Sequence, residues 1–248
     1  MKILIGRDHD EFSEMGAKYV ADFIRANPGK LICLAAGDTP LGIYKRLAEM
    51  QKRGEIDLNS MYYAGLDEWA GIGYETKGSC AQVMRDNFYG PAGIECGRMR
   101  VFDGLAADLE KECKQVSQWV KANGGVAFTI LGIGMNGHIG FNEPNTDPEK
   151  DALVVDLDAV TADVGRKYFH GAACPVKGMT LGVKTLKAAD EVVLAVSGSK
   201  KGNILRKTLT EGPSTAIPSS LMRNCSNLTV LTDESAFRAM WGTEFTIP

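Results

Sequence analysis

The sequence is poor in the residues that build metal centres, disulfide frameworks and membrane spans. Its 248 residues include only three histidines and six cysteines, and no cysteine belongs to a CxxC or CxxH pair. We therefore expect free thiols in a reducing compartment and no metal site. No apolar run approaches the length of a membrane span, and the N-terminal segment becomes charged at Arg7, too early for a signal peptide. These features predict a cytoplasmic protein without a cofactor.

The chain also lacks an excess of either charge. Its 28 basic and 31 acidic side chains leave a net charge of −3, and the pI is about 5.7. Nucleic acid and anionic membranes are therefore not expected as partners. The composition, 44% hydrophobic and 24% charged, can fill a sizeable core, and no linker or low-complexity tract interrupts it. We expect residues 1–248 to form a single domain.

What the sequence does contain is a regular alternation of apolar strands and amphipathic helices. The expected strands are Lys2–Ile5, Leu31–Ala36, Tyr62–Leu66, Met99–Phe102, Val126–Ile133, Ala152–Leu157, Met179–Val183, Glu191–Ser197 and Asn227–Leu231. The expected helices are Glu11–Ala26, Pro40–Met50 with Thr39 as its N-cap, Ser79–Phe88, Ala106–Ala122, Ala162–His170 and one opening at Gly198–Lys201. The pattern predicts an α/β fold: a doubly wound, mostly parallel sheet with helices on both faces, a Rossmann-like three-layer sandwich.

A glycine-rich turn after the strand Val126–Ile133 carries one of the three histidines, His138, with Glu143 five residues later. In a doubly wound sheet, ligands bind beside the carboxyl ends of the strands, which is where this turn lies. A histidine hydrogen-bonded to a backbone carbonyl in an ordinary turn explains the same pattern. The turn alone does not separate the two interpretations.

Three further turns follow strands and would meet at the same edge of the sheet. Ala35–Gly42 leads into a helix N-terminus, which suits a phosphate, although an ordinary turn fits as well. Gly65–Gly71 carries Asp67 and Glu68, one of which could act as a general base; the alternative is a solvated acidic turn. Val196–Asn203 places Lys200 and Lys201 at a helix start, where cations are unfavourable unless an anion binds. Surface lysines are the alternative, which we prefer for Lys200.

These motifs together resemble the glucosamine-6-phosphate deaminase/isomerase family. The resemblance spans almost the whole chain and rests on the segments GDTPLGIYK, LDEW, GIGMNGHIGFNEP and SGSKK, in the family's order and approximate spacing. Two further segments, GSC at 78–80 and PSTAIPSS at 213–220, look closer to the galactosamine-6-phosphate isomerase branch. The resemblance implies conversion of an aminohexose 6-phosphate to a ketohexose 6-phosphate with release of ammonia.

The resemblance also implies roles for individual residues. Asp67 matches the family's base at C2, and His138 matches the residue that moves the ring-oxygen proton, with Glu143 in its relay. Asn136 stands where members often have an aspartate, and an amide can orient His138 but cannot supply a charge. The 6-phosphate would bind the residues Gly37, Asp38, Thr39 and Lys201. No cofactor is implied, and the small-molecule substrate is the one expected ligand.

Two departures bear on the substrate. Asp38 is a carboxylate within the phosphate turn, which requires that it face a sugar hydroxyl or a lysine. The arginine that commonly contacts phosphate is replaced by Ala162, for which Arg166 or Lys167 could substitute.

Two other functions remain open as alternatives. A 6-phosphogluconolactonase shares the glycine turn, but that group typically reads DER where this chain has DEW, and it lacks FNEP. A sugar-phosphate-sensing domain of a transcriptional regulator would carry a basic DNA-binding segment, which this acidic chain lacks. The chain continues only a short way past Trp241, which favours a monomer or small homo-oligomer.

Overall fold

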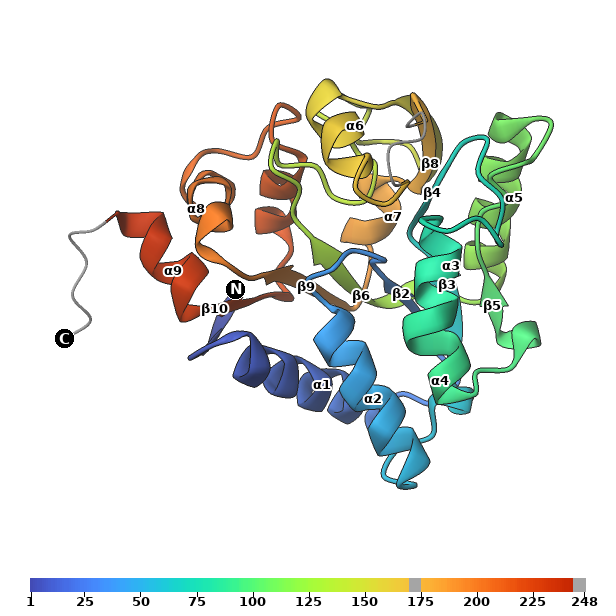
Figure 1. Ribbon diagram of the computed structural model, residues 1–248, viewed down its shortest axis with the longest axis horizontal. Helices are drawn as coiled ribbons and strands as arrows, with labels where there is room; N and C mark the ends of the chain where they lie inside the picture. The colour runs from blue at the N-terminus through green and yellow to red at the C-terminus, as the bar shows by residue number, and fades with distance from the viewer. Residues whose placement is uncertain (170–174, 243–248) are drawn as a thin grey trace.

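The structure, a computed structural model, describes residues 1–169 and 175–242, whose strands form two sheets (Figure 1). All neighbouring strands of the larger sheet are parallel. Its order is β1 (Lys2–Gly6), β10 (Leu228–Asp233), β9 (Glu191–Val196), β6 (Val126–Gly132), β2 (Leu31–Leu34), β3 (Tyr62–Gly65) and β5 (Met99–Arg100). The predicted α/β fold with a mostly parallel sheet is confirmed.

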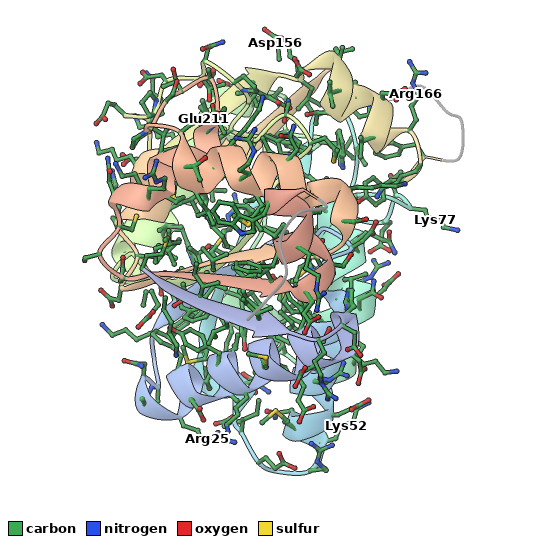
Figure 2. All side chains as sticks on the ribbon, turned by 90° about the vertical axis from the view of Figure 1, so that its left-hand side faces the viewer. Arg25, Lys52, Lys77, Asp156, Arg166 and Glu211 are labelled. Carbon is green, nitrogen blue, oxygen red and sulfur yellow. The ribbon has the colours of Figure 1, made fainter. Side chains whose placement is uncertain are left out.

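Helices cover both faces of this sheet, which Figure 2 shows nearly edge-on between them. One face carries α1 (His9–Ala26), α2 (Leu41–Lys52), α3 (Cys80–Met84) and α4 (Gly90–Ala92). The opposite face carries α5 (Leu109–Ala122), α7 (Val183–Lys187), α8 (Gly202–Thr210) and α9 (Glu234–Trp241). No helix of the described residues is long and apolar enough to cross a membrane.

The strands are apolar throughout because both of their faces are buried. Along β2, Leu31 and Cys33 pack into the core on the α5 side, whereas Ile32 and Leu34 pack on the α1 side. This alternation follows from the two-residue period of a strand. It gives the large sheet a core on each face, and a smaller cluster around Trp69 and Phe141 packs against the small sheet.

The parallel series is interrupted by a second sheet, which the sequence pattern did not predict. It consists of β4 (Asp67–Trp69), β8 (Lys177–Leu181) and β7 (Ala152–Asp156), all antiparallel. The expected strands Ala152–Leu157 and Met179–Val183 exist, but they belong here. Periodicity identifies a strand without naming its partner, so this pairing could not be read from it. With α6 (Ala159–Gly165), this small sheet lies beyond the carboxyl edge of the large one (Figure 1).

Several element boundaries differ from the expectation. α6 begins at Ala159 because the Asp158 carboxylate caps it by accepting a hydrogen bond from the Val160 backbone N–H. The expected end of that helix, His170, lies outside the described residues. Helix α9 was not predicted, although Asp233 caps it through the Ala236 N–H.

The strand order also shows where the chain changes direction. From β2 the sheet grows outward through β3 and β5, and from β6 it grows the other way through β9 and β10. The neighbouring strands β2 and β6 therefore form a topological switch point, and the loops that follow them face each other.

Candidate active site

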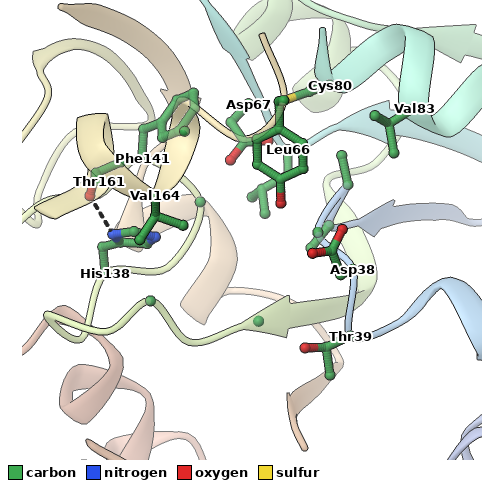
Figure 3. Close-up of a pocket in the computed structure, with 18 of the residues that line it drawn as sticks. Asp38, Thr39, Leu66, Asp67, Cys80, Val83, His138, Phe141, Thr161 and Val164 are labelled. Atoms are coloured by element: carbon green, nitrogen blue, oxygen red, sulfur yellow. Dashed lines mark hydrogen bonds between the residues drawn. The ribbon is translucent and has the colours of Figure 1, made fainter. Parts of the chain in front are cut away.

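A cavity of about 260 Å³ opens at this switch point, between the large sheet, the small sheet and α6 (Figure 3). All four turns singled out in the sequence contribute to its wall. The predicted site residues that line it are Gly37, Asp38, Thr39, Asp67, His138 and Lys201. The other two, Asn136 and Glu143, do not line the cavity and contact His138 from behind.

The imidazole of His138 is held through one of its nitrogens. Its Nδ1 lies 2.9 Å from the Thr161 hydroxyl oxygen and 3.6 Å from Oε2 of Glu143. The other ring nitrogen points into the cavity (Figure 3). A ring held in this way can exchange a proton with a bound molecule through Nε2.

Asn136 joins the two members of this pair. Its amide nitrogen donates to Glu143 Oε2 at 2.9 Å, and its amide oxygen accepts from the His138 backbone N–H at 3.2 Å. Burial opposes ionisation of Glu143, but hydrogen bonds and charge from His138, with hydrogen bonds from Thr161 and Asn136, lower its pKa overall. Glu143 is therefore a carboxylate, and Asn136 connects it to the backbone of His138; that this amide orients the pair stays a prediction.

The glycines of this turn have separate structural reasons. A Cβ on Gly134 would lie 2.3 Å from His138 Nε2, so only glycine lets the imidazole pack against the backbone here. Gly137 has φ +90°, which a larger residue rarely adopts. The position of His138 thus depends on backbone that only glycine allows.

Asp67 faces the cavity from the small sheet. The prediction placed it just past a strand, but it is the first residue of β4, immediately after the chain leaves β3. Burial and the neighbouring charge of Glu68 raise the pKa of Asp67, and a hydrogen bond from the Cys80 thiol lowers it by a smaller amount. The resulting pKa is about 7. A carboxyl group with this pKa can accept a proton near neutral pH.

Glu68 points the opposite way, as strand alternation requires. Its buried carboxylate accepts hydrogen bonds from the Ser79 hydroxyl at 2.8 Å and from the backbone N–H groups of Trp69, Cys80 and Ala81. These bonds tie β4 to the start of α3. Of the two candidates for a base, Asp67 alone lines the cavity.

The other end of the cavity is rich in hydrogen-bond donors. The predicted Thr39 cap of α2 is wrong: the helix begins at Leu41, Pro40 occupies the cap position, and no side chain caps it. The helix N-terminus therefore has no side-chain cap, and Thr39 lines the cavity. Lys201 approaches from the start of α8, and its ammonium donates to the Ile133 carbonyl at 2.6 Å. Burial, together with the charge of Lys167, lowers the pKa of Lys201.

Asp38, the carboxylate in the turn Ala35–Gly42, does face a lysine. Lys167 Nζ lies 2.6 Å from Asp38 Oδ2, and both residues line the cavity. Arg166, the other candidate substitute for the missing arginine, does not line it; its side chain is 69% exposed and points outward (Figure 2). Lys200 is exposed, as expected.

This geometry can be compared with that of known proteins. The sequence model of the family "Glucosamine-6-phosphate isomerases/6-phosphogluconolactonase" matches residues 9–231. The chain belongs to this family.

Curated relatives in the family include glucosamine-6-phosphate deaminases. That of Thermoanaerobacter sp. (strain X514) is 35% identical over 95% of this chain and 94% of its own length. The deaminase of Halothermothrix orenii is 34% identical over 95% of this chain and 98% of its own length. The solved structure of a monomeric glucosamine-6-phosphate deaminase superposes with a TM-score of 0.93 at 32% identity, covering 96% of this chain and all of that one. A 6-phosphogluconolactonase from Trypanosoma brucei, at 18% identity and a TM-score of 0.72, shares the fold.

Three cavity residues of this family member were missed or left undecided by the sequence. Thr161 gave no signal in the sequence, because it lies just before the expected start of the helix Ala162–His170. Cys80 was noted only as part of a branch-like segment. Lys167 was one of two alternatives, and only the fold shows which side chain turns inward. Among residues 1–169 and 175–242, no three His, Cys, Asp or Glu side chains are grouped so as to hold a metal ion.

Proposed function

We propose that this protein is an aldose–ketose isomerase and deaminase that converts an aminohexose 6-phosphate to a ketohexose 6-phosphate and ammonia. One observation carries the proposal: a carboxyl group with its pKa near 7, Asp67, and a carboxylate-supported imidazole, His138, face the same cavity from different walls. A reaction with one proton transfer at oxygen and another at carbon needs two such groups at different positions.

Ring opening is the task proposed for His138. A cyclic aldose opens when the anomeric hydroxyl loses its proton and the ring oxygen gains one. Nε2 of His138 takes the first proton and returns it to the ring oxygen, while Glu143 stabilises the imidazolium formed in between. The product is the open-chain aldehyde.

Isomerisation is the task proposed for Asp67. The aldehyde makes the C2 hydrogen acidic, and the Asp67 carboxylate removes it to give an enolamine. The C1 oxygen gains a proton as C2 loses one, and return of a proton to C1 then leaves an imine at C2. Water adds to this imine, the nitrogen gains a proton, and the C2–N bond breaks to release ammonia and form the ketone. Every step is a proton transfer, the addition of water or the loss of ammonia, which these side chains can support.

The phosphate would bind at the donor-rich end of the cavity. The open N-terminus of α2, Thr39 and the ammonium of Lys201 supply hydrogen bonds and positive charge there. Held at this point, the 6-phosphate would orient C1 and C2 toward Asp67 and His138. The proposed phosphate residues are those predicted: Gly37, Asp38, Thr39 and Lys201.

Two finer points belong to the same proposal. Ala162 and the branch-like segments support galactosamine 6-phosphate as a substrate beside glucosamine 6-phosphate. The monomeric solved relative supports a monomer or small homo-oligomer, and the five described cysteines are free thiols, which suits the cytoplasm.

The test is an ammonia-release assay over glucosamine 6-phosphate, galactosamine 6-phosphate and their N-acetyl forms. We expect ammonia and ketose phosphate from at least one free amine and neither product from the N-acetyl forms. Rapid opening of 6-phosphogluconolactone without ammonia release from any amine would show that the proposal is wrong.

A further inference from the structure

The contact between α6 and the His138 ring has no role in the mechanism above. Thr161 lies in α6, and its side chain is almost fully buried, with 4% exposed. Its hydroxyl oxygen lies 2.9 Å from His138 Nδ1, whereas Glu143 Oε2 lies 3.6 Å from the same nitrogen. The hydroxyl, rather than the carboxylate, is therefore the direct partner of the ring.

The carboxylate itself is incompletely satisfied. Glu143 is buried, with 3% exposed, and its Oε1 has no hydrogen-bond partner among the described residues. A buried acceptor without a donor is costly, by about 1–3 kcal/mol. The nearby group with a proton to give is the hydroxyl of Thr161, which contributes to the low pKa of Glu143. Its oxygen lies 2.9 Å from His138 Nδ1, so the hydroxyl is placed beside both groups.

The position of Glu143 fixes the direction of the contact between Thr161 and the ring. The ionised carboxylate lies 3.6 Å from Nδ1, where it stabilises a ring N–H and repels a ring lone pair. The Thr161 oxygen, at 2.9 Å, then accepts from Nδ1–H of His138. The ring is thereby held with its proton on Nδ1 and its lone pair on Nε2, the nitrogen that faces the cavity (Figure 3).

We propose that Thr161 is a positioning residue that relays between His138 and Glu143 and fixes the imidazole tautomer able to accept a proton. This inference rests on the proposed function, in which Nε2 must take a proton from the sugar. It also links the site to α6, whose Val160 and Val164 line the cavity. A shift of α6 would therefore alter the ring as well as the cavity wall.

Two substitutions distinguish the role of the Thr161 hydroxyl from the role of its side-chain packing. Thr161→Val keeps the shape and removes the hydroxyl, whereas Thr161→Ser keeps the hydroxyl and removes a methyl group. We expect kcat of Thr161→Val to fall by about 10- to 100-fold with KM changed less than about 2-fold, because the phosphate contacts are untouched. Thr161→Ser should retain kcat within about 3-fold. Equal losses in both variants, or full activity of Thr161→Val, would contradict the relay.

A second measurement does not depend on turnover. In protein labelled with ¹⁵N-histidine, NMR spectra report the tautomer of each ring, with His9 and His170 as internal references. We expect His138 of the unaltered protein to carry its proton on Nδ1, and Thr161→Val to show a mixture of tautomers. A proton on Nε2 in the unaltered protein would overturn the relay even if the enzyme is active. If no aminohexose phosphate is turned over, the proposed function fails and the spectra still decide the role of Thr161.

Discussion

At the scale of single residues, two adjacent carboxyl groups have opposite surroundings. Asp67 is half-buried in the cavity wall beside Glu68 and lacks strong donors, so its ionised form is disfavoured and its pKa rises to about 7. Burial also raises the pKa of Glu68, but four donors stabilise its charge. One carboxyl group is thus poised to take a proton, and its neighbour holds α3 in place.

Replacing each carboxyl group by the corresponding amide, in Asp67→Asn and Glu68→Gln, should therefore change the stability of the protein in opposite directions. In the folded protein Asp67 titrates near 7, above its unfolded value, so the folded state binds the extra proton and stability falls as pH rises from about 4 to 7. At pH 8, Asp67→Asn should raise the free energy of unfolding by at least about 1 kcal/mol, and the gain should vanish near pH 4. Turnover should be lost while sugar-phosphate binding remains. Denaturant titrations at both pH values, with calorimetric binding, measure these effects; strong residual turnover would remove Asp67 from the role of base.

The matched change, Glu68→Gln, should destabilise the protein. The NH₂ group of the amide replaces one carboxylate oxygen, so either Ala81 N–H or the N–H groups of Trp69 and Cys80 lose their acceptor, at a cost of about 2 kcal/mol. The same denaturant titrations measure the loss. A Glu68→Gln protein as stable as the parent would mean that these four bonds contribute little.

The two lysines at the start of α8 give a second matched pair. Lys201 lines the cavity and Lys200 faces solvent. We expect Lys201→Ala to raise KM for the sugar phosphate by about 10- to 100-fold with a smaller change in kcat. The substitution removes a positive charge proposed to bind the 6-phosphate, which is remote from the reacting carbons. Lys200→Ala should leave both constants within about 2-fold. Steady-state kinetics of the two variants decides the point, and an unchanged KM for Lys201→Ala would count against its phosphate role.

At the scale of elements, the sequence predicts the strands and the four turns well because their signals are local. Apolar runs, Asp–Glu–Trp after a strand and the glycine-rich turn need no knowledge of distant residues. The small sheet could not be predicted, because whether Met179 pairs with Glu68 depends on the whole topology. Thr161 and Lys167 were missed or undecided for the same reason: nothing local in α6, or in the turn that follows it, indicates that they meet His138 and Asp38.

The glycine turn after β6 allows a test of how much the site depends on backbone. A Cβ at Gly134 would collide with the His138 ring, whereas a Cβ at Gly132 would meet nothing within 4 Å, and neither residue has a positive φ. We expect Gly134→Ala to lower kcat by about 100-fold by displacing the imidazole, and Gly132→Ala to be close to the parent. Circular dichroism would establish that both variants fold. Equal activities would show that the ring can move without loss.

At the scale of the whole molecule, the cavity lies where three parts of the chain meet. Its walls come from the carboxyl edge of the large sheet, from the small sheet and from α6. The Asp38–Lys167 ion pair spans the same parts, but with side chains 64% and 50% exposed it contributes little to stability. A ligand in the cavity would therefore add contacts to all three parts at once.

An open-chain hexitol 6-phosphate, which carries the phosphate but no carbonyl group to react, should bind in the cavity and contact all three parts of its wall. At 100 times its Kd such a ligand adds about 2.7 kcal/mol to the stability of the folded state. For a chain of this size, that corresponds to a rise in Tm of about 5–10 °C. The unphosphorylated hexitol should give no rise, and the shift should shrink in Lys201→Ala but not in Lys200→Ala, because the phosphate provides the anchor. Thermal unfolding with the two hexitols measures this, and equal shifts for both would mean that the cavity recognises the hydroxyl groups rather than the phosphate.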